Sequence, residues 1–207
     1  MKDQPVGVQP ARGDLRRTAL LEALDHHLRQ NPAPGSLDSI NIADISRRAG
    51  VTRSAFYFYF ENKASAVAAL MQNMYDESSA AADQLNAGGR PAENIEAMVR
   101  ALFSTWDKHE HLFRASLDAR ATSVTVRELW DNDRESFVPV VAAMIEAQRR
   151  SGAAPPGVDA TALASVLLEL NDRMLERLAI GGLLGREEIV EAVVAIWLHT
   201  IYGEVRG

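Results

Sequence analysis

The sequence contains no cysteine among its 207 residues. This absence excludes disulfide bonds, thiolate metal sites and cysteine nucleophiles, and it fits the reducing interior of a cell. Long apolar runs are also missing, since no stretch approaches the roughly 18 residues that a membrane helix needs. The N-terminal segment lacks the apolar core of a secretion signal. We therefore expect a cytoplasmic protein that makes no contact with a membrane.

Positive charge is scarce, because the formal net charge is −6, and this argues against a protein that binds nucleic acids indiscriminately. The charges are unevenly distributed. Residues 1–80 hold nine Lys/Arg and nine Asp/Glu, whereas residues 81–207 hold thirteen and nineteen. Within residues 12–63, eight basic side chains outnumber six acidic ones. A locally basic end on an acidic body would let only one end of the molecule engage DNA.

Helical periodicity of apolar residues runs through almost the whole chain and predicts an all-α protein of about nine helices. The expected helices cover, to within a few residues, 14–30, 41–48, 52–59, 63–85, 91–107, 111–118, 125–150, 159–180 and 186–203. Residues 121–126 favour a strand on propensity alone, but Thr125 and Glu128 have the spacing of a capping box and favour a helix start. Pro139 predicts a kink or a local break in that helix.

The same pattern predicts three parts of the chain. Residues 1–13 form a flexible tail rich in proline and glycine. Residues 14–63 form a small helical domain. Residues 64–207 form a larger helical domain, and its first part, residues 64–85, is a connecting helix with Val67, Leu70, Met71 and Met74 at helical spacing.

The most informative segment is residues 42–63, which has the pattern of two short helices joined by a tight turn. Asn41 is an N-cap residue for the first helix. Gly50 stands where a left-handed residue ends that helix, and Thr52 is an N-cap residue for the next one. A second helix held in this way can place its first turns in the major groove of DNA. The side chains expected to meet bases there are Arg53, Ser54, Tyr57 and Phe58. The side chains expected to bind phosphates are Thr52, Tyr59 and Lys63. The first free amides of the helix after Asn62 are also expected to meet a phosphate oxygen.

At these residues the sequence resembles the TetR family of bacterial transcriptional repressors. The resemblance rests on Ala49-Gly50-Val51, on Thr52, on the aromatic run Phe56-Tyr57-Phe58-Tyr59-Phe60, and on Lys63. Two positions depart from the family pattern, because Phe56 replaces the usual Leu and Tyr59 the frequent His. The likeness continues in residues 119–124, 128–130, 150–155, 170–173, 196–197 and 201–204. It implies a DNA-binding repressor that leaves its operator when a small apolar ligand fills a tunnel in the helical domain.

The resemblance also implies that residues 14–63 bind DNA and that residues 64–207 bind the effector and dimerise. The homodimer would pair through the last two helices. Both helices are apolar on more than one side, and a helix that is apolar all round must bury two faces. One face would serve its own domain and the other a partner. The alternative is that both faces are buried within a monomer.

The resemblance further implies a mostly apolar effector pocket lined by aromatic residues and an asparagine amide. The matching positions are Met98, Leu102, Trp106, Trp130, Phe137, Val141, Leu168, Asn171, Leu175 and Trp197. Aromatic residues at helical spacing are as typical of a core as of a pocket. The Asn171 amide would bond either a ligand or a backbone carbonyl. Arg134 and Glu176 depart from the resembled pattern and would either recognise a polar group of the effector or lie on a solvated face.

Rival functions find less support in the sequence. No glycine-rich phosphate loop and no Gly-x-Ser-x-Gly elbow is present. His109 and His111 lie two apart on a predicted helix, where side chains diverge by about 200° and cannot share a metal. We therefore expect neither catalysis nor a cofactor nor a metal site. The alternative is an all-α small-molecule-binding protein or an enzyme without a DNA function.

Overall fold

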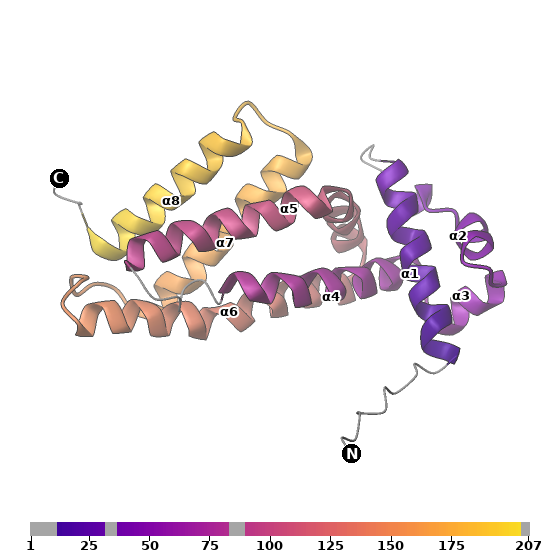
Figure 1. Cartoon of the computed structure of the whole chain (residues 1–207), viewed down its shortest axis with the longest axis horizontal. Coiled ribbons are helices and arrows are strands. Elements are labelled where there is room, and N and C mark those ends of the chain that lie inside the picture. Colours follow the sequence, from indigo (N-terminus) through magenta and orange to yellow (C-terminus); the bar gives the residue numbers. More distant parts are fainter. Residues whose placement is uncertain (1–11, 32–36, 83–89, 204–207) are drawn as a thin grey trace, which may run out of the picture.

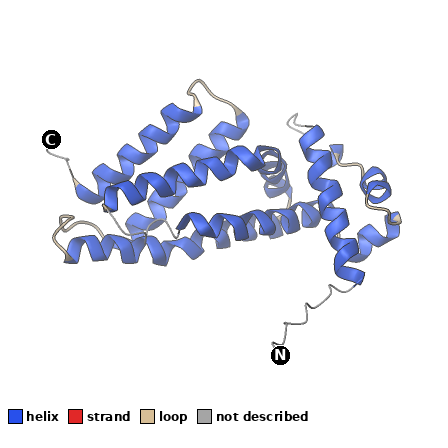
Figure 2. Ribbon diagram, in the orientation of Figure 1, coloured by secondary structure: helices blue, strands red, loops and turns tan. Residues whose placement is uncertain are grey.

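The computed structural model describes residues 12–31, 37–82 and 90–203. These residues form eight α-helices and one short 3-10 helix joined by loops, so the predicted all-α class is confirmed (Figure 2). The elements are α1 (Arg12–Gln30), η1 (Leu37–Ser39), α2 (Ile42–Arg48), α3 (Arg53–Tyr59), α4 (Lys63–Ala82), α5 (Pro91–Thr122), α6 (Val124–Arg150), α7 (Ala160–Ile180) and α8 (Arg186–Tyr202). Most of the predicted tail, and the predicted end of the connecting helix, lie outside the described residues.

In the described ranges there are eight α-helices rather than nine because one expected break is a kink. Helix α5 spans both of the helices predicted at 91–107 and 111–118. The backbone leaves helical geometry inside α5 at His109, where φ is −121° and ψ is 20°. The sequence therefore located the interruption correctly but predicted a gap where the chain only bends.

The N-cap of helix α6 lies two residues earlier than the predicted one. Its N-cap is Ser123, whose hydroxyl accepts a hydrogen bond from the Val126 amide, so the capping box expected from Thr125 and Glu128 is wrong. The strand alternative for residues 121–126 is also wrong, because this segment ends α5 and begins α6. Pro139 lies within α6 without ending it. Its ring is exposed, so water can satisfy the carbonyl one turn earlier that has lost its helical partner.

Helices α1, α2 and α3 form a head at one end of the molecule, at the right of Figure 1. The head is held by apolar side chains from all three helices, including Leu20, Leu24, Ile45 and Phe56, each almost fully buried. Phe60 closes this core, and the guanidinium of Arg17 lies over its ring at 5.5 Å. A cation over an aromatic face adds a modest attraction to the apolar packing.

The body consists of the remaining helices arranged around α5. Helix α5 contacts α1, α4, α6, α7 and α8, while α6 packs along α7. Helix α4 leaves the head and runs into the body beside α5 and α6 (Figure 1). Its inner face is apolar from Ala64 to Tyr75 and includes Val67, Met71 and Met74. The helix that follows α3 is thus part of the core of the body.

A second contact joins the head to the body at the kink in α5. The Nε2 of His111 lies 2.7 Å from a carboxylate oxygen of Asp25, and Arg29 donates to the Lys108 carbonyl at 3.4 Å. Burial lowers the pKa of His111, which favours its neutral form. Burial alone would raise the pKa of Asp25, but hydrogen bonds from Arg29 and His111 lower it on balance. An ionised Asp25 therefore holds α1 against α5 on both sides of His109.

We expect the change Gly50→Ala to destabilise the head by about 1–2 kcal/mol, the usual cost of a left-handed backbone for an alanine. Gly50 has φ of 67°, and a Cβ added there would meet no atom within 4 Å, so the cost comes from the backbone alone. The measurement is the free energy of unfolding in urea. Gly13→Ala, in the exposed first turn of α1, is the control and should be neutral or slightly stabilising. Equal stability of the Gly50→Ala variant and the unchanged protein would contradict the assignment.

Candidate DNA-binding and effector sites

The turn between α2 and α3 is fixed by capping hydrogen bonds. Asn41 caps α2, and the Thr52 hydroxyl caps α3, as the sequence predicted. Gly50 adopts the left-handed conformation between them. Val51 is partly buried against the core, and its amide donates to the Ser46 carbonyl at 3.0 Å. This set of contacts holds α3 at a fixed angle to α2, as a DNA-reading helix requires.

Helix α3 buries one face and exposes the other. Phe56 is buried against α2 and α1, with its ring centroid 5.4 Å from that of Phe60. The opposite face carries the four predicted base-contacting residues, all exposed: Arg53, Ser54, Tyr57 and Phe58. Phe58 is 81% exposed and Tyr57 is 47% exposed. Large aromatic side chains held in water in this way mark a surface that meets a partner.

The residues expected to bind phosphates are partly engaged by contacts within the protein. The Thr52 hydroxyl lies 2.9 Å from the Ser54 hydroxyl as well as capping α3. Tyr59 is half-buried. Lys63 donates from Nζ to the Asp38 carbonyl at 3.2 Å, which leaves its other N–H groups for further partners. Their phosphate contacts stay predictions.

The first amides of α4 were also expected to meet a phosphate. Asn62 and Ser65 instead form a reciprocal cap, because the Ser65 amide donates to the Asn62 side chain at 2.9 Å and the Asn62 amide donates to the Ser65 hydroxyl at 3.1 Å. One of the expected amides is therefore already satisfied. The cap fixes the point at which the DNA-binding segment passes into the body.

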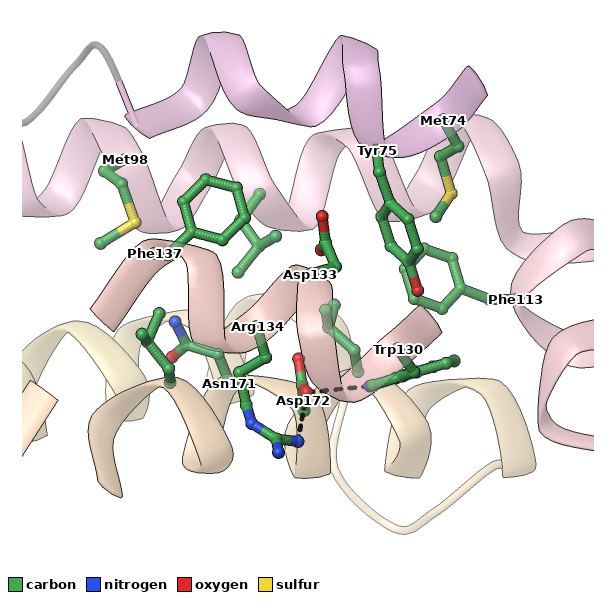
Figure 3. Close-up of a pocket in the computed structure, with 13 residues that line it drawn as sticks. Met74, Tyr75, Met98, Phe113, Trp130, Asp133, Arg134, Phe137, Asn171 and Asp172 are labelled. Carbon is green, nitrogen blue, oxygen red and sulfur yellow. Dashed lines mark hydrogen bonds and ion pairs between the residues drawn. The ribbon is translucent and has the colours of Figure 1, made fainter. Parts of the chain in front are cut away.

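A cavity of about 80 Å³ lies in the body between α4, α5, α6 and α7 (Figure 3). Seven of the ten predicted pocket residues line it: Met98, Leu102, Trp130, Phe137, Leu168, Asn171 and Leu175. Three do not, and these are Trp106, Val141 and Trp197, which are buried in the surrounding helix packing. Six lining residues were not predicted as pocket positions: Met74, Tyr75, Phe113, Asp133, Arg134 and Asp172.

Asn171 occupies the wall of this cavity and is only 1% exposed. Its Oδ1 accepts a hydrogen bond from the Trp197 indole at 3.1 Å, a partner that the sequence did not indicate. Its Nδ2 has no hydrogen-bond partner in the described residues. A buried amide left half-satisfied costs free energy unless an incoming group accepts its N–H. The indole of Trp197 thus orients the amide, although Trp197 itself does not reach the cavity.

The cavity wall also carries charge. The Trp130 indole donates to an Asp172 oxygen at 2.9 Å, and Arg134 approaches the same oxygen at 3.4 Å (dashed lines in Figure 3). Burial raises the pKa of Asp172 from 3.8 to about 6, even though both of these neighbours act to lower it. Tyr75 is buried, and its hydroxyl has no hydrogen-bond partner in the described residues. Burial also raises the pKa of Tyr75, with further contributions from nearby carboxylates.

The lining residues that were not predicted differ in how strongly the sequence indicated their positions. Met74 continues the apolar stripe of α4, so the sequence indicated its burial but not its cavity. Arg134 was noted as a departure from the resembled pattern, and it does line the cavity. Glu176, the other departure, lies outside it and pairs with Arg173 at 2.5 Å. Asp172 gave no signal, because its burial depends on α6 crossing α7.

Two further expectations concern metals and membranes. Across the described ranges, no group of His, Asp and Glu side chains has the arrangement of a metal site. The rings of His109 and His111 lie 6.4 Å apart between centroids, and His111 is engaged by Asp25. None of the described helices has both the length and the apolar character that crossing a bilayer requires.

Comparison with known families assigns both halves of the chain. Residues 36–70 match the family described as "Bacterial regulatory proteins, tetR family", which covers η1, α2, α3 and the start of α4. Residues 95–203 match the family described as "Transcriptional regulator EthR, C-terminal domain". The second match includes most of the helices that enclose the cavity.

Individual relatives agree with these matches. The HTH-type transcriptional regulator EthR of Mycobacterium tuberculosis is 34% identical over 98% of this chain and 95% of the relative. EthR of Mycolicibacterium smegmatis is 28% identical over 96% of this chain and 93% of the relative. Among solved structures, FadR of Bacillus subtilis in complex with stearoyl-CoA has a TM-score of 0.68 at 14% identity, covering 90% of this chain and 98% of FadR.

A TetR-family regulator of Syntrophomonas wolfei shares the fold with a TM-score of 0.71 at 16% identity, over 95% of this chain and all of the other. These relatives are transcriptional regulators rather than enzymes. The exposed aromatic face of α3, the capped turn before it and the matches along both halves lead to one assignment. The chain belongs to the TetR family of DNA-binding transcriptional regulators and is an EthR-like member of it.

Proposed function

We propose that this regulator is a repressor that leaves its operator when a small, largely apolar ligand fills the cavity. The observation that carries the proposal is the course of α4. This helix begins at Lys63, shortly after α3 ends, and it places Met74 and Tyr75 in the cavity wall. At about 1.5 Å per residue, the distance along the axis from Lys63 to Tyr75 is about 18 Å. One helix therefore connects the DNA-reading end with the ligand-binding end.

The size of the cavity supports a change of shape on binding. Pockets that hold drug-sized ligands measure roughly 300–1,000 Å³, whereas this one measures about 80 Å³. A ligand must therefore move the walls apart. One wall is α4 and the opposite walls are α6 and α7, so widening the cavity displaces α4 against the body. That displacement would change the position of α3.

The proposed functions divide at the start of α4. We assign DNA binding to residues 14–63, with Arg53, Ser54, Tyr57 and Phe58 against bases and Thr52, Tyr59 and Lys63 toward phosphates. We assign effector binding and dimerisation to residues 64–207. Asn171 is the central polar contact for the ligand, because its Nδ2 is free to donate. No cofactor is needed, and the site of action is the cytoplasm, where the chromosome lies.

A homodimer would form through the outer faces of α7 and α8. The inner face of α8 is buried and includes Val190, Val193 and Trp197. Its outer face exposes Ile196, and α7 exposes Val166, at 44% and 65% respectively. An apolar second face on adjoining helices favours a partner over the monomer alternative. A two-fold dimer would present two copies of α3 about 34–36 Å apart, one turn of DNA.

We expect the protein to retard DNA from its own upstream region, and Arg53→Ala or Tyr57→Ala to weaken binding at least about tenfold. Each change removes a side chain placed to contact base edges, a contact that contributes about 1–3 kcal/mol. Arg150→Ala, the same change at the far end of α6, is the control and should bind normally. Absence of retardation at low salt would favour the alternative of a helical ligand-binding protein without a DNA function.

We expect an apolar ligand to lower operator affinity, and operator DNA to lower ligand affinity by the same factor. Both equilibria share the displacement of α4, and coupled binding free energies are reciprocal. Octanol is a suitable probe, with binding followed by tryptophan fluorescence because Trp130 lines the cavity. Operator affinity is then measured by fluorescence anisotropy of labelled DNA. Tight octanol binding with unchanged operator affinity would refute induction by this route.

We expect Val166→Arg and Ile196→Arg to convert a dimer into a monomer of 22.7 kDa, measured by light scattering after gel filtration. A charge buried in an apolar interface without a partner costs several kcal/mol. Val124→Arg, at an exposed position on α6, is the control and should stay dimeric. A monomeric unchanged protein that still binds its operator would contradict the dimer.

A further inference from the structure

The cavity is chemically divided. In Figure 3, Met98 and Phe137 lie on one side, and Tyr75, Phe113 and Trp130 lie on the other. The carboxylates of Asp133 and Asp172 lie between these two groups. An effector that was apolar throughout would place apolar atoms against these carboxylates, at a cost in free energy.

Carboxylates outnumber guanidiniums among the residues that line the cavity, which include Asp133, Asp172 and Arg134. Arg134 is shared between Asp172, at 3.4 Å, and three exposed carboxylates outside the cavity: Asp131 at 3.3 Å, Glu135 at 3.7 Å and Glu169 at 3.2 Å. The Arg120 guanidinium lies over the Trp130 ring at 5.1 Å. The excess of carboxylates in the wall favours a cation.

Two buried polar groups in the same wall have no hydrogen-bond partner in the described residues. The Tyr75 side chain is only 8% exposed, and its hydroxyl has no hydrogen-bond partner in the part of the chain that the structure describes. The Nδ2 of Asn171 is in the same condition. A hydroxyl can accept a hydrogen bond from an ammonium group, whereas an amide N–H needs an acceptor. A ligand that carries both a hydrogen-bond donor and an acceptor would therefore satisfy both groups.

The raised pKa of Asp172 is consistent with this arrangement. Its Trp130 and Arg134 neighbours do not offset the cost of burying its charge. A cation bound beside it would supply the missing compensation, and charge-assisted hydrogen bonds are the strong ones in such a site. The faces of Tyr75 and Trp130 can add attraction to a cation.

We propose that the effector is a cationic amphiphile, with a protonated amine at Asp133, Asp172 and the Tyr75 hydroxyl and an apolar body along Met98 and Phe137. This inference rests on the proposed function only in taking the cavity as the effector site. It makes the ligand class opposite in charge to the stearoyl-CoA held by FadR of Bacillus subtilis. An acceptor atom on the ligand body would meet the Asn171 amide.

The test compares octylamine, octanol and octanoate, which share an eight-carbon chain and differ in charge. Binding to the full-length protein is measured by calorimetry at neutral pH, without DNA. We expect octylamine to bind at least about tenfold more tightly than octanol, and octanoate to bind most weakly, because a charge-assisted hydrogen bond is about twice as strong as a neutral one. Equal or tighter binding of octanol or octanoate would overturn the proposal.

Single substitutions test which carboxylate makes octylamine bind more tightly than octanol. Asp133→Asn should remove most of the advantage of octylamine over octanol while leaving octanol binding intact, which also reports that the cavity is folded. Tyr75→Phe removes only the hydroxyl and should weaken octylamine by about threefold. Asp131→Asn is the matched control, since it removes the same charge from α6 and from the Arg134 cluster but does not line the cavity. A loss for Asp131→Asn as large as for Asp133→Asn would show a diffuse field rather than a site.

Failure of this inference and failure of the proposed function give different results. If octanol binds and lowers operator affinity but octylamine binds no better, the cation assignment is wrong and the induction mechanism stands. If octylamine binds in a manner that depends on Asp133 but operator affinity does not respond, the cation site stands and induction is wrong.

Discussion

The continuity of α4 is the constraint on which the rest of the structure depends. Its first turn is fixed by the reciprocal cap between Asn62 and Ser65, directly after the helix that would read DNA. Its inner face is buried against α5 and α6, so it cannot shift without repacking the core. A close-packed interior passes on displacements rather than absorbing them. This packing supports the proposal that a change in the cavity wall at Tyr75 reaches the head.

Local signals in the sequence were sufficient for the DNA-binding end. The caps at Asn41 and Thr52 and the left-handed Gly50 depend only on neighbouring backbone groups, so a linear sequence records them. The outward face of α3 also followed from spacing alone. The interruption in α5 was located correctly for the same reason, but a gap between two helices was predicted where the structure has a kink. A kink at His109 is retained because α1 packs against both sides of it through Asp25 and Arg29.

The cavity was harder to predict because it is made by helices that are distant in sequence. The same apolar residue types occur in any helical core, so only the family resemblance indicated the apolar lining of the cavity. Neither the residue types nor the resemblance indicated the charged part of its wall. Asp172 and Trp130 are 42 positions apart, and their hydrogen bond exists only because α6 crosses α7. The position of α4 in the wall likewise depends on packing, so periodicity identified Met74 as buried without indicating a cavity beside it.

In the mechanism that we propose, two half-satisfied polar groups explain how so small a cavity can respond to a ligand. Widening the cavity costs packing contacts between α4 and the helices opposite, and a purely apolar ligand would recover only part of that cost. The Asn171 Nδ2 and the Tyr75 hydroxyl have no hydrogen-bond partner in the described residues, so a ligand that pairs them gains more than its apolar area alone provides. Because a ligand shifts an equilibrium only by its difference in affinity for the two states, these two groups would select which molecules open the cavity and move α4.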